Sequence, residues 1–139
     1  MHENQNWIVY NPQNIEGISG AYDVEILREE DSLKFTVYCE NKTVDVYFRC
    51  NVPMYLYSDE GVRMAAYVPV QEKNNDKHYF NKWFLYKVEN SDFIRWAAKE
   101  SCGFCFEEKL FHFCIITDND VVDILSMGEP EIIIKDTNS

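Results

Sequence analysis

Residues 21–50 alternate strictly between apolar and polar side chains, and this pattern constrains the fold more than any other feature of the chain. A period of two is typical of strands that bury one face of a sheet and leave the other in water. The pattern restarts twice, after residues 29–32 and after residues 41–42, and so predicts three consecutive strands. Their apolar positions are Tyr22, Val24 and Ile26, then Leu33, Phe35, Val37 and Cys39, then Val44, Val46, Phe48 and Cys50.

The turns between these strands predict how the strands pair. A two-residue turn at residues 41–42 would place Val37 opposite Val46. A four-residue loop at residues 29–32 would place Val24 opposite Val37. Every apolar side chain then faces another apolar side chain on the neighbouring strand, which is the consistency that an antiparallel meander requires.

The same register brings charged and aromatic side chains together on the outward face of the three strands. Its rows are Asp23, Tyr38 and Asp45, then Glu25, Thr36 and Tyr47, with Arg49 beyond them. Tyrosine offers a large rigid contact area, and carboxylates form strong hydrogen bonds with Lys and Arg. This face therefore predicts a surface that binds a basic protein, with Asp23, Glu25, Tyr38, Asp45 and Tyr47 as the partner-binding residues. The competing interpretation is a covered face, or tyrosines that only pair across strands.

Beyond residue 50 the chain predicts further strands and one main helix. Strands are expected at residues 53–58, 62–68, 83–88, 109–117, 121–126 and 130–135. A short helix at residues 59–67 is the alternative to the strand at 62–68. Residues 71–82 are expected to form a polar surface loop. Together with the meander, these elements predict a single α+β domain over residues 1–139. Its mostly antiparallel sheet, built from an N-terminal meander and a C-terminal hairpin, would carry one main helix packed against it.

The helix is expected at residues 91–101. Ser91 is a favourable N-cap, and Asp92 lies in the first turn, where the helix dipole favours negative charge. One apolar face contains Phe93, Ile94, Ala97 and Ala98. Gly103 is the residue type that commonly follows a helix C-terminus.

Cys102 and Cys105 lie at the end of this helix with the spacing of redox and zinc motifs. In redox motifs the pair opens a helix, whose dipole lowers the thiol pKa, whereas here the pair follows a helix and lies close to glutamates. A zinc site would also need His112 and Cys114, but residues two apart in a strand stand roughly 7 Å apart, which is wide for one ion. The pair is therefore interpreted as a helix stop with buried thiols, and neither a metal nor a cofactor is expected.

Catalytic motifs are missing from the sequence. The chain has no nucleophile elbow, no zinc-protease motif and no glycine-rich phosphate loop. His112 is interpreted as a hydrogen-bonded side chain on a partly covered sheet face rather than a general base. Asp118, Asp120 and Asp123 surround a turn that lacks the glycine and the distal glutamate of a calcium loop, so they are interpreted as a solvated turn. An enzyme is the less favoured hypothesis.

Charge narrows the class of partner. The net charge of −11 divides into −6 for residues 1–31, +2 for residues 32–99 and −7 for residues 100–139. Such a charge repels nucleic acid and anionic membranes, and it attracts basic proteins. The five cysteines are an odd number, and the chain shows neither a signal-peptide pattern nor a long apolar run, which together predict reduced thiols and a cytoplasmic location.

Size, acidity and the lack of catalytic groups favour a small bacterial-type binding protein that neutralises a basic protein partner, as immunity proteins and inhibitors do. Direct binding of nucleic acid or membrane is not expected. The alternative is a small-molecule-binding domain or an enzyme with an aromatic-lined cavity. The aromatic candidates for such a cavity are Trp83, Tyr86, Trp96 and Phe111.

Overall fold

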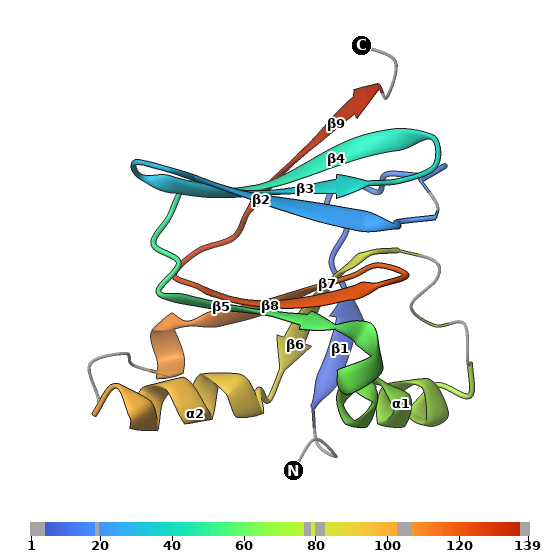
Figure 1. The fold of residues 1–139 in the computed structure, drawn as a ribbon. Coiled ribbons are helices and arrows are strands. Elements are labelled where there is room, and N and C mark those ends of the chain that lie inside the picture. The colour runs from blue at the N-terminus through green and yellow to red at the C-terminus, as the bar shows by residue number, and fades with distance from the viewer. Residues whose placement is uncertain (1–4, 19, 77–78, 80–82, 103–106, 137–139) are drawn as a thin grey trace.

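The computed structural model describes residues 5–18, 20–76, 79, 83–102 and 107–136, with the backbone alone described at 60, 64–67 and 136. The described residues form nine strands in two antiparallel sheets and two α-helices (Figure 1). One sheet stacks on the other, and both helices lie on the far side of the second sheet (Figure 1). The prediction of a mostly antiparallel chain with helical elements is confirmed, and the arrangement as two stacked sheets was not foreseen.

The first sheet has the strand order β2-β3-β4-β9. Its strands are β2 (Asp23–Glu29), β3 (Ser32–Tyr38), β4 (Lys42–Phe48) and β9 (Glu131–Asp136). Val24 pairs with Val37, as predicted. The predicted register between β3 and β4 is wrong by two residues, because the turn lies at residues 40–41 and Val37 pairs with Val44. Since the shift is an even number, every side chain keeps its predicted face.

The second sheet has the strand order β1-β6-β7-β8-β5. Its strands are β1 (Asn6–Val9), β5 (Met54–Asp59), β6 (Leu85–Glu89), β7 (Phe111–Ile116) and β8 (Asp120–Ser126). The predicted strand at residues 53–58 and the C-terminal hairpin are both confirmed. The strand β1 was not predicted, because four residues are too few to establish an alternation. The edges of this sheet are β1 and β5.

The main core lies between the two sheets. Phe113 of β7 is fully buried at its centre, with ring centroids 5.0 Å from Tyr10 and 5.8 Å from Phe48. Phe35 of β3 meets Phe48 edge-to-face at 5.8 Å. These offset and edge-on arrangements are the ones that aromatic pairs prefer. The inward face predicted for the meander is thus the face that packs against β7 and β8.

The helix α2 (Asp92–Glu100) confirms the predicted helix almost to the residue. Ser91 is its N-cap, and the Ser91 hydroxyl accepts a hydrogen bond from the Ile94 N–H at 3.1 Å. The prediction that Gly103 ends the helix lies outside the described residues. Within them, Cys102 follows the helix with a φ of 54°, the left-handed conformation that closes many helices.

A second helix, α1 (Met64–Lys73), occupies most of the segment that was predicted as a strand at residues 62–68, so the strand is wrong. The alternative of a short helix at residues 59–67 is nearer to the structure, in which a 3-10 turn at Glu60–Val62 precedes α1. The strand β5 finds its partner in β8 rather than in the segment that follows it, and this leaves residues 64–73 free to coil. Ala and Met near the start of that segment favour a helix. Val70 then joins a buried apolar cluster with Trp7 and Tyr86 of the second sheet. Two helices of similar length replace the single main helix of the prediction.

The face of the first sheet that points away from the core is uncovered. None of the described elements lies over it in Figure 1. Neither α1 nor α2 is long and apolar enough to span a bilayer.

We expect Phe113→Ala to lower the free energy of unfolding by about 3–5 kcal/mol, because it removes the aromatic ring that fills the centre of the core. Urea denaturation monitored by fluorescence would measure the loss. Val62, which is 76% exposed, provides the control, and Val62→Ala should change stability by less than about 0.5 kcal/mol. A loss under about 1 kcal/mol for Phe113→Ala would contradict this packing.

Candidate functional site

The five residues predicted to bind a partner all lie on the uncovered face of the first sheet. The structure arranges them in rows that differ from the predicted ones, because of the shifted register between β3 and β4. Tyr38 lies between Asp23 and Thr43, and Thr36 lies between Glu25 and Asp45. Tyr47 lies opposite Lys34. The five predicted residues therefore remain on one face but divide into two groups with different surroundings.

Asp45 belongs to the group whose charges are already paired. It is only 2% exposed, and its carboxylate accepts hydrogen bonds from Lys135 at 2.6 Å and from the Thr36 hydroxyl at 2.8 Å. Burial alone would raise the pKa of Asp45, but the hydrogen bonds and the Lys135 charge outweigh it and hold the pKa below its usual value. Asp45 thus acts within the sheet, where it ties β9 to β4.

Tyr47 belongs to the same internally bonded group. Its hydroxyl donates to Glu29 at 2.9 Å and lies 3.0 Å from the Ser32 hydroxyl. The guanidinium of Arg49 lies 4.4 Å from the centre of the Tyr47 ring and pairs with Glu131 at 3.2 Å. At this end of the face the charged and tyrosine side chains bond to one another. This agrees with the competing interpretation, in which the tyrosines pair across strands.

Asp23, Glu25 and Tyr38 form the second group, at the edge strand β2. Both carboxylates are exposed, and the Tyr38 hydroxyl donates to Glu25 at 3.0 Å. The hydrogen bond to Glu25, partial burial and the neighbouring carboxylate charges raise the pKa of Tyr38 above its usual value. Within the described part of the chain, neither Asp23 nor Glu25 has an ion-pair partner. On the predicted face, this group is therefore the one whose carboxylates could form ion pairs with a partner.

The neighbouring strand β5 extends this acidic group around the edge of the molecule. Tyr57 is 52% exposed, and its hydroxyl donates to Asp120 of β8. The pKa of Tyr57 is raised first by that hydrogen bond, then by burial and by the charges of Asp120, Asp23 and Asp59. Asp23 therefore acts on Tyr38 in one sheet and on Tyr57 in the other. We call the five residues Asp23, Glu25, Tyr38, Tyr57 and Asp59 the acidic edge.

The sequence analysis missed Tyr57 and Asp59. Their approach to Asp23 depends on the pairing of β5 with β8, in which Asp59 lies opposite Asp120. That pairing joins residues about sixty positions apart, and no local pattern shows it. The sequence did show a group of aspartates at residues 118–123 near this pairing. Their interpretation as a solvated turn is wrong for Asp120 and Asp123, which are both buried.

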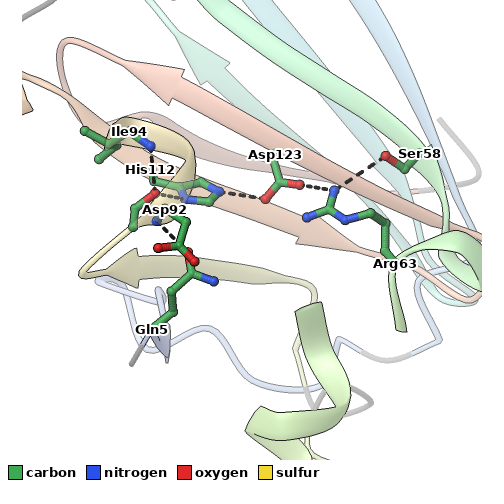
Figure 2. Close-up of polar contacts among 8 residues, drawn as sticks. Gln5, Ser58, Arg63, Asp92, Ile94, His112 and Asp123 are labelled. Carbon is green, nitrogen blue, oxygen red and sulfur yellow. Dashed lines mark hydrogen bonds and ion pairs between the residues drawn. The ribbon is translucent and has the colours of Figure 1, made fainter. Parts of the chain in front are cut away.

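A second polar cluster lies on the opposite side of the second sheet, between the two helices (Figure 2). His112 of β7 is 3% exposed and lies between Ser91 and Asp123, with Nδ1 2.6 Å from Ser91 Oγ and Nε2 2.6 Å from Asp123 Oδ1. The Nη1 nitrogen of Arg63 donates to Asp123 Oδ2. Arg63 and Ser91 are the N-cap residues of α1 and α2, so this cluster ties the start of each helix to the sheet.

The cluster has the residue types of a serine hydrolase triad but not its geometry. In such triads the serine bonds to Nε2 and the aspartate to Nδ1, and here the two contacts are exchanged. Ser91 is only 4% exposed, and its hydroxyl oxygen accepts from the Ile94 N–H as the helix cap. Its own hydrogen is then available to His112 Nδ1, which places the ring hydrogen on Nε2 facing Asp123. We interpret the cluster as a structural tie, not as a nucleophile with its base.

Asp123 keeps its charge in spite of its burial. Desolvation would raise the pKa of Asp123, but the hydrogen bond from His112 and the charge of Arg63 outweigh it and hold the pKa below its usual value. Cys114 lies beside it, where burial and the Asp123 charge raise the thiol pKa well above its usual value. A zinc site using His112 would have to break one of the hydrogen bonds that its two ring nitrogens make, and Cys105 lies outside the described residues. Among the described residues, no group of three potential ligands is arranged around a metal position.

The aromatic residues proposed for a cavity are dispersed. Trp83 and Tyr86 are buried and donate to backbone carbonyls, Trp83 to Tyr10 at 2.9 Å and Tyr86 to Trp83 at 2.6 Å. Phe111 is half-buried beside Phe113. Trp96, in contrast, is 51% exposed on α2.

Comparison of the chain with protein-family models, with curated proteins and with solved structures gave no match. Its function is therefore inferred from its own residues.

We expect Asp123→Ala to lower the free energy of unfolding by about 3–5 kcal/mol, because it leaves Arg63 without its counter-charge and His112 without its acceptor. Thermal and urea denaturation would measure the loss. Asp118→Ala, at an exposed turn position, is the matched control and should cost less than about 0.5 kcal/mol. Equal stability of the two variants would show that the cluster contributes nothing to the fold.

Stability should fall as the solution is acidified from about pH 4 downward, since Asp45 and Asp123 have a lower pKa in the folded chain than in the unfolded chain. Such groups stabilise the fold above their unfolded pKa, and that stabilisation is lost as the pH falls through the folded pKa. Urea unfolding at several pH values between 7 and about 3 would measure the slope. Asp45→Asn should flatten it, whereas Glu30→Gln, at an exposed turn, should leave it unchanged. An unaltered slope in Asp45→Asn would count against the Lys135 pair.

Proposed function

We propose that this chain is a small acidic binding protein that neutralises a basic protein partner, in the manner of an immunity protein or an inhibitor, and that it binds this partner through the acidic edge. The observation that carries the proposal is the convergence of exposed carboxylates from two sheets on two tyrosines. Asp23 and Asp59 come from different strands, and both raise the pKa of Tyr57. Neither has an ion-pair partner among the described residues.

The fold also brings together the two acidic ends of the sequence. The backbone N–H of Asp118 donates to the Ala21 carbonyl at 3.0 Å, and the side-chain amide of Asn119 donates to the Tyr22 carbonyl at 3.2 Å. These bonds hold the turn between β7 and β8 against the start of β2. Negative charge from residues 1–31 and from residues 100–139 therefore adds at this edge, and summed charge of one sign attracts an oppositely charged partner and speeds association.

The side-chain types at the acidic edge suit a basic protein surface. Tyr57 and Tyr22 are 52% and 45% exposed, and tyrosine is enriched among the residues that dominate binding energy. The carboxylates of Asp23 and Asp59 can each accept hydrogen bonds from an Arg or Lys side chain. Each of these carboxylates accepts one backbone N–H through Oδ1, from Val24 and from Gly61, and neither is in an ion pair among the described residues. A new ion pair there therefore does not have to replace an old one.

The test is affinity capture from a lysate of the source cells, at low and at high salt, with Asp23→Asn/Asp59→Asn beside the unaltered chain. We expect the unaltered chain to retain one basic protein at low salt and to release it at high salt, because screening weakens exposed charge pairs. The double variant should retain much less of that protein. Glu100→Gln/Glu108→Gln, at exposed positions near the end of α2, is the charge-matched control and should retain it fully.

With that protein purified, Tyr57→Ala should weaken binding by at least about 1 kcal/mol if the acidic edge is the interface. Capture that is equal for both double variants would place the interface elsewhere, and capture of no basic protein by any form of the chain would reject the proposed function.

A further inference from the structure

A pocket of about 270 Å³ opens between α1 and α2, on the side of the second sheet that faces away from the main core. The buried side chains of His112 and Asp123 lie at its base. Trp96 of α2 and Leu56 of β5 line it and are 51% and 47% exposed. The pocket is separate from the acidic edge, and its polar groups belong to the cluster in Figure 2.

Arg63 gives this pocket N–H donors that no acceptor among the described residues uses. Its side chain is 20% exposed, and its hydrogen bonds to Asp123 and to Ser58, the latter at 3.5 Å, both use the single nitrogen Nη1. The nitrogens Nε and Nη2 have no acceptor among the described residues. In Figure 2 the second terminal nitrogen of Arg63 points away from Ser58, toward the side on which His112 lies. Two adjacent N–H groups in this fixed fork match the two oxygens of a carboxylate.

The surroundings hold Arg63 in place without using that fork. Asp123 is anchored by His112, so the guanidinium is bound to a carboxylate that is itself fixed. Asp92, the other carboxylate that lines the pocket, is paired with Arg95 at the start of α2. Asp123 is thus offset by Arg63 and Asp92 by Arg95, which lowers the repulsion that an anion entering the pocket would meet. The Arg63 charge is already paired, so what it offers a ligand is the hydrogen bonds of its fork.

The walls favour an apolar ligand body. The Trp96 ring stacks on Phe93 with centroids 6.0 Å apart, and both line the pocket. Large apolar side chains that stay exposed beside a concave site with few polar groups are typical of ligand pockets. At about 270 Å³ the volume lies just below the usual range for ligand pockets, which limits the ligand to roughly ten to fifteen non-hydrogen atoms.

We propose that this pocket binds a small carboxylic acid, with the carboxylate on Nε and Nη2 of Arg63 and a flat apolar body against Trp96 and Leu56. The proposal is independent of the partner bound at the acidic edge, since it uses none of the same residues.

The test uses 3-phenylpropionate as the probe and its uncharged amide as the matched control compound. Both are titrated into the unaltered chain while the indole N–H resonances of its three tryptophans are followed by NMR, with Trp96→Phe used to assign the Trp96 signal. We expect the acid to shift the Trp96 resonance saturably and the amide to bind at least about tenfold more weakly, because only the acid offers a charged two-oxygen acceptor to Arg63.

A variant then tests the role of Arg63. Arg63→Lys keeps the positive charge but removes the fork, and we expect it to weaken binding of the acid about tenfold. Arg28→Lys, at an exposed position of β2, is the matched control and should bind as the unaltered chain does. A melting curve checks that each variant folds. If Arg63→Lys does not fold, the comparison of acid with amide decides alone.

Three results would each overturn the proposal. The first is equal affinity for the acid and the amide, and the second is a saturable shift at Trp83 without one at Trp96. The third is the lack of any saturable shift up to about 10 mM acid, which corresponds to binding too weak to represent a site.

Discussion

The central strands β7 and β8 of the second sheet are buried on both faces, and the rest of the structure follows from covering both. One face meets the first sheet through Phe113, Ile115 and Ile124, and the other meets the helices. All seven residues of β8 are buried as a result. Apolar burial drives this layering, but it also forces every polar group on β8 to find a partner inside the protein, since an unpaired buried charge is very costly.

Asp123 shows how that demand is met. It lies on the helix side of β8, where Arg63 and His112 supply two donors and Ser91 completes the cluster. Ser91 caps α2 through its hydroxyl, and Arg63 occupies the N-cap position of α1 without a side-chain capping bond, so the groups around one buried carboxylate lie at the start of both helices. Removing Ser91 would therefore cost α2 its capping bond as well as the contact with His112. The pocket follows from the same arrangement, since its base is this cluster and its walls include Phe93 and Trp96 of α2 and Leu56 of β5.

Local patterns were enough to predict the meander, the strand β5, the C-terminal hairpin and the capped helix α2, because alternation and capping are properties of neighbouring residues. No local pattern showed that the two sheets stack. The choice between a strand and a helix after β5 stayed open, because it depends on β5 pairing with β8 across the sequence. The residues of the candidate site likewise divide into those that local patterns predicted and those that depend on distant contacts. Asp23, Glu25 and Tyr38 were found from one meander, whereas the addition of Tyr57 and the pairing of Asp45 with Lys135 required contacts to distant strands. No sequence pattern signalled that Ser91, His112 and Asp123 would meet.

The acidic edge also bears on the unpaired backbone groups that every open sheet has along its edge strands. The strands β2 and β5 are both edge strands with unpaired backbone groups along one side, and Tyr55, Leu56 and Tyr57 leave β5 unusually apolar for an edge. An exposed apolar edge invites pairing with a second copy of the same chain. Asp23 and Asp59 oppose that pairing, because two identical acidic edges repel each other. Under the proposed function the same charges would favour a basic partner, so one set of carboxylates would act against self-association and for the partner.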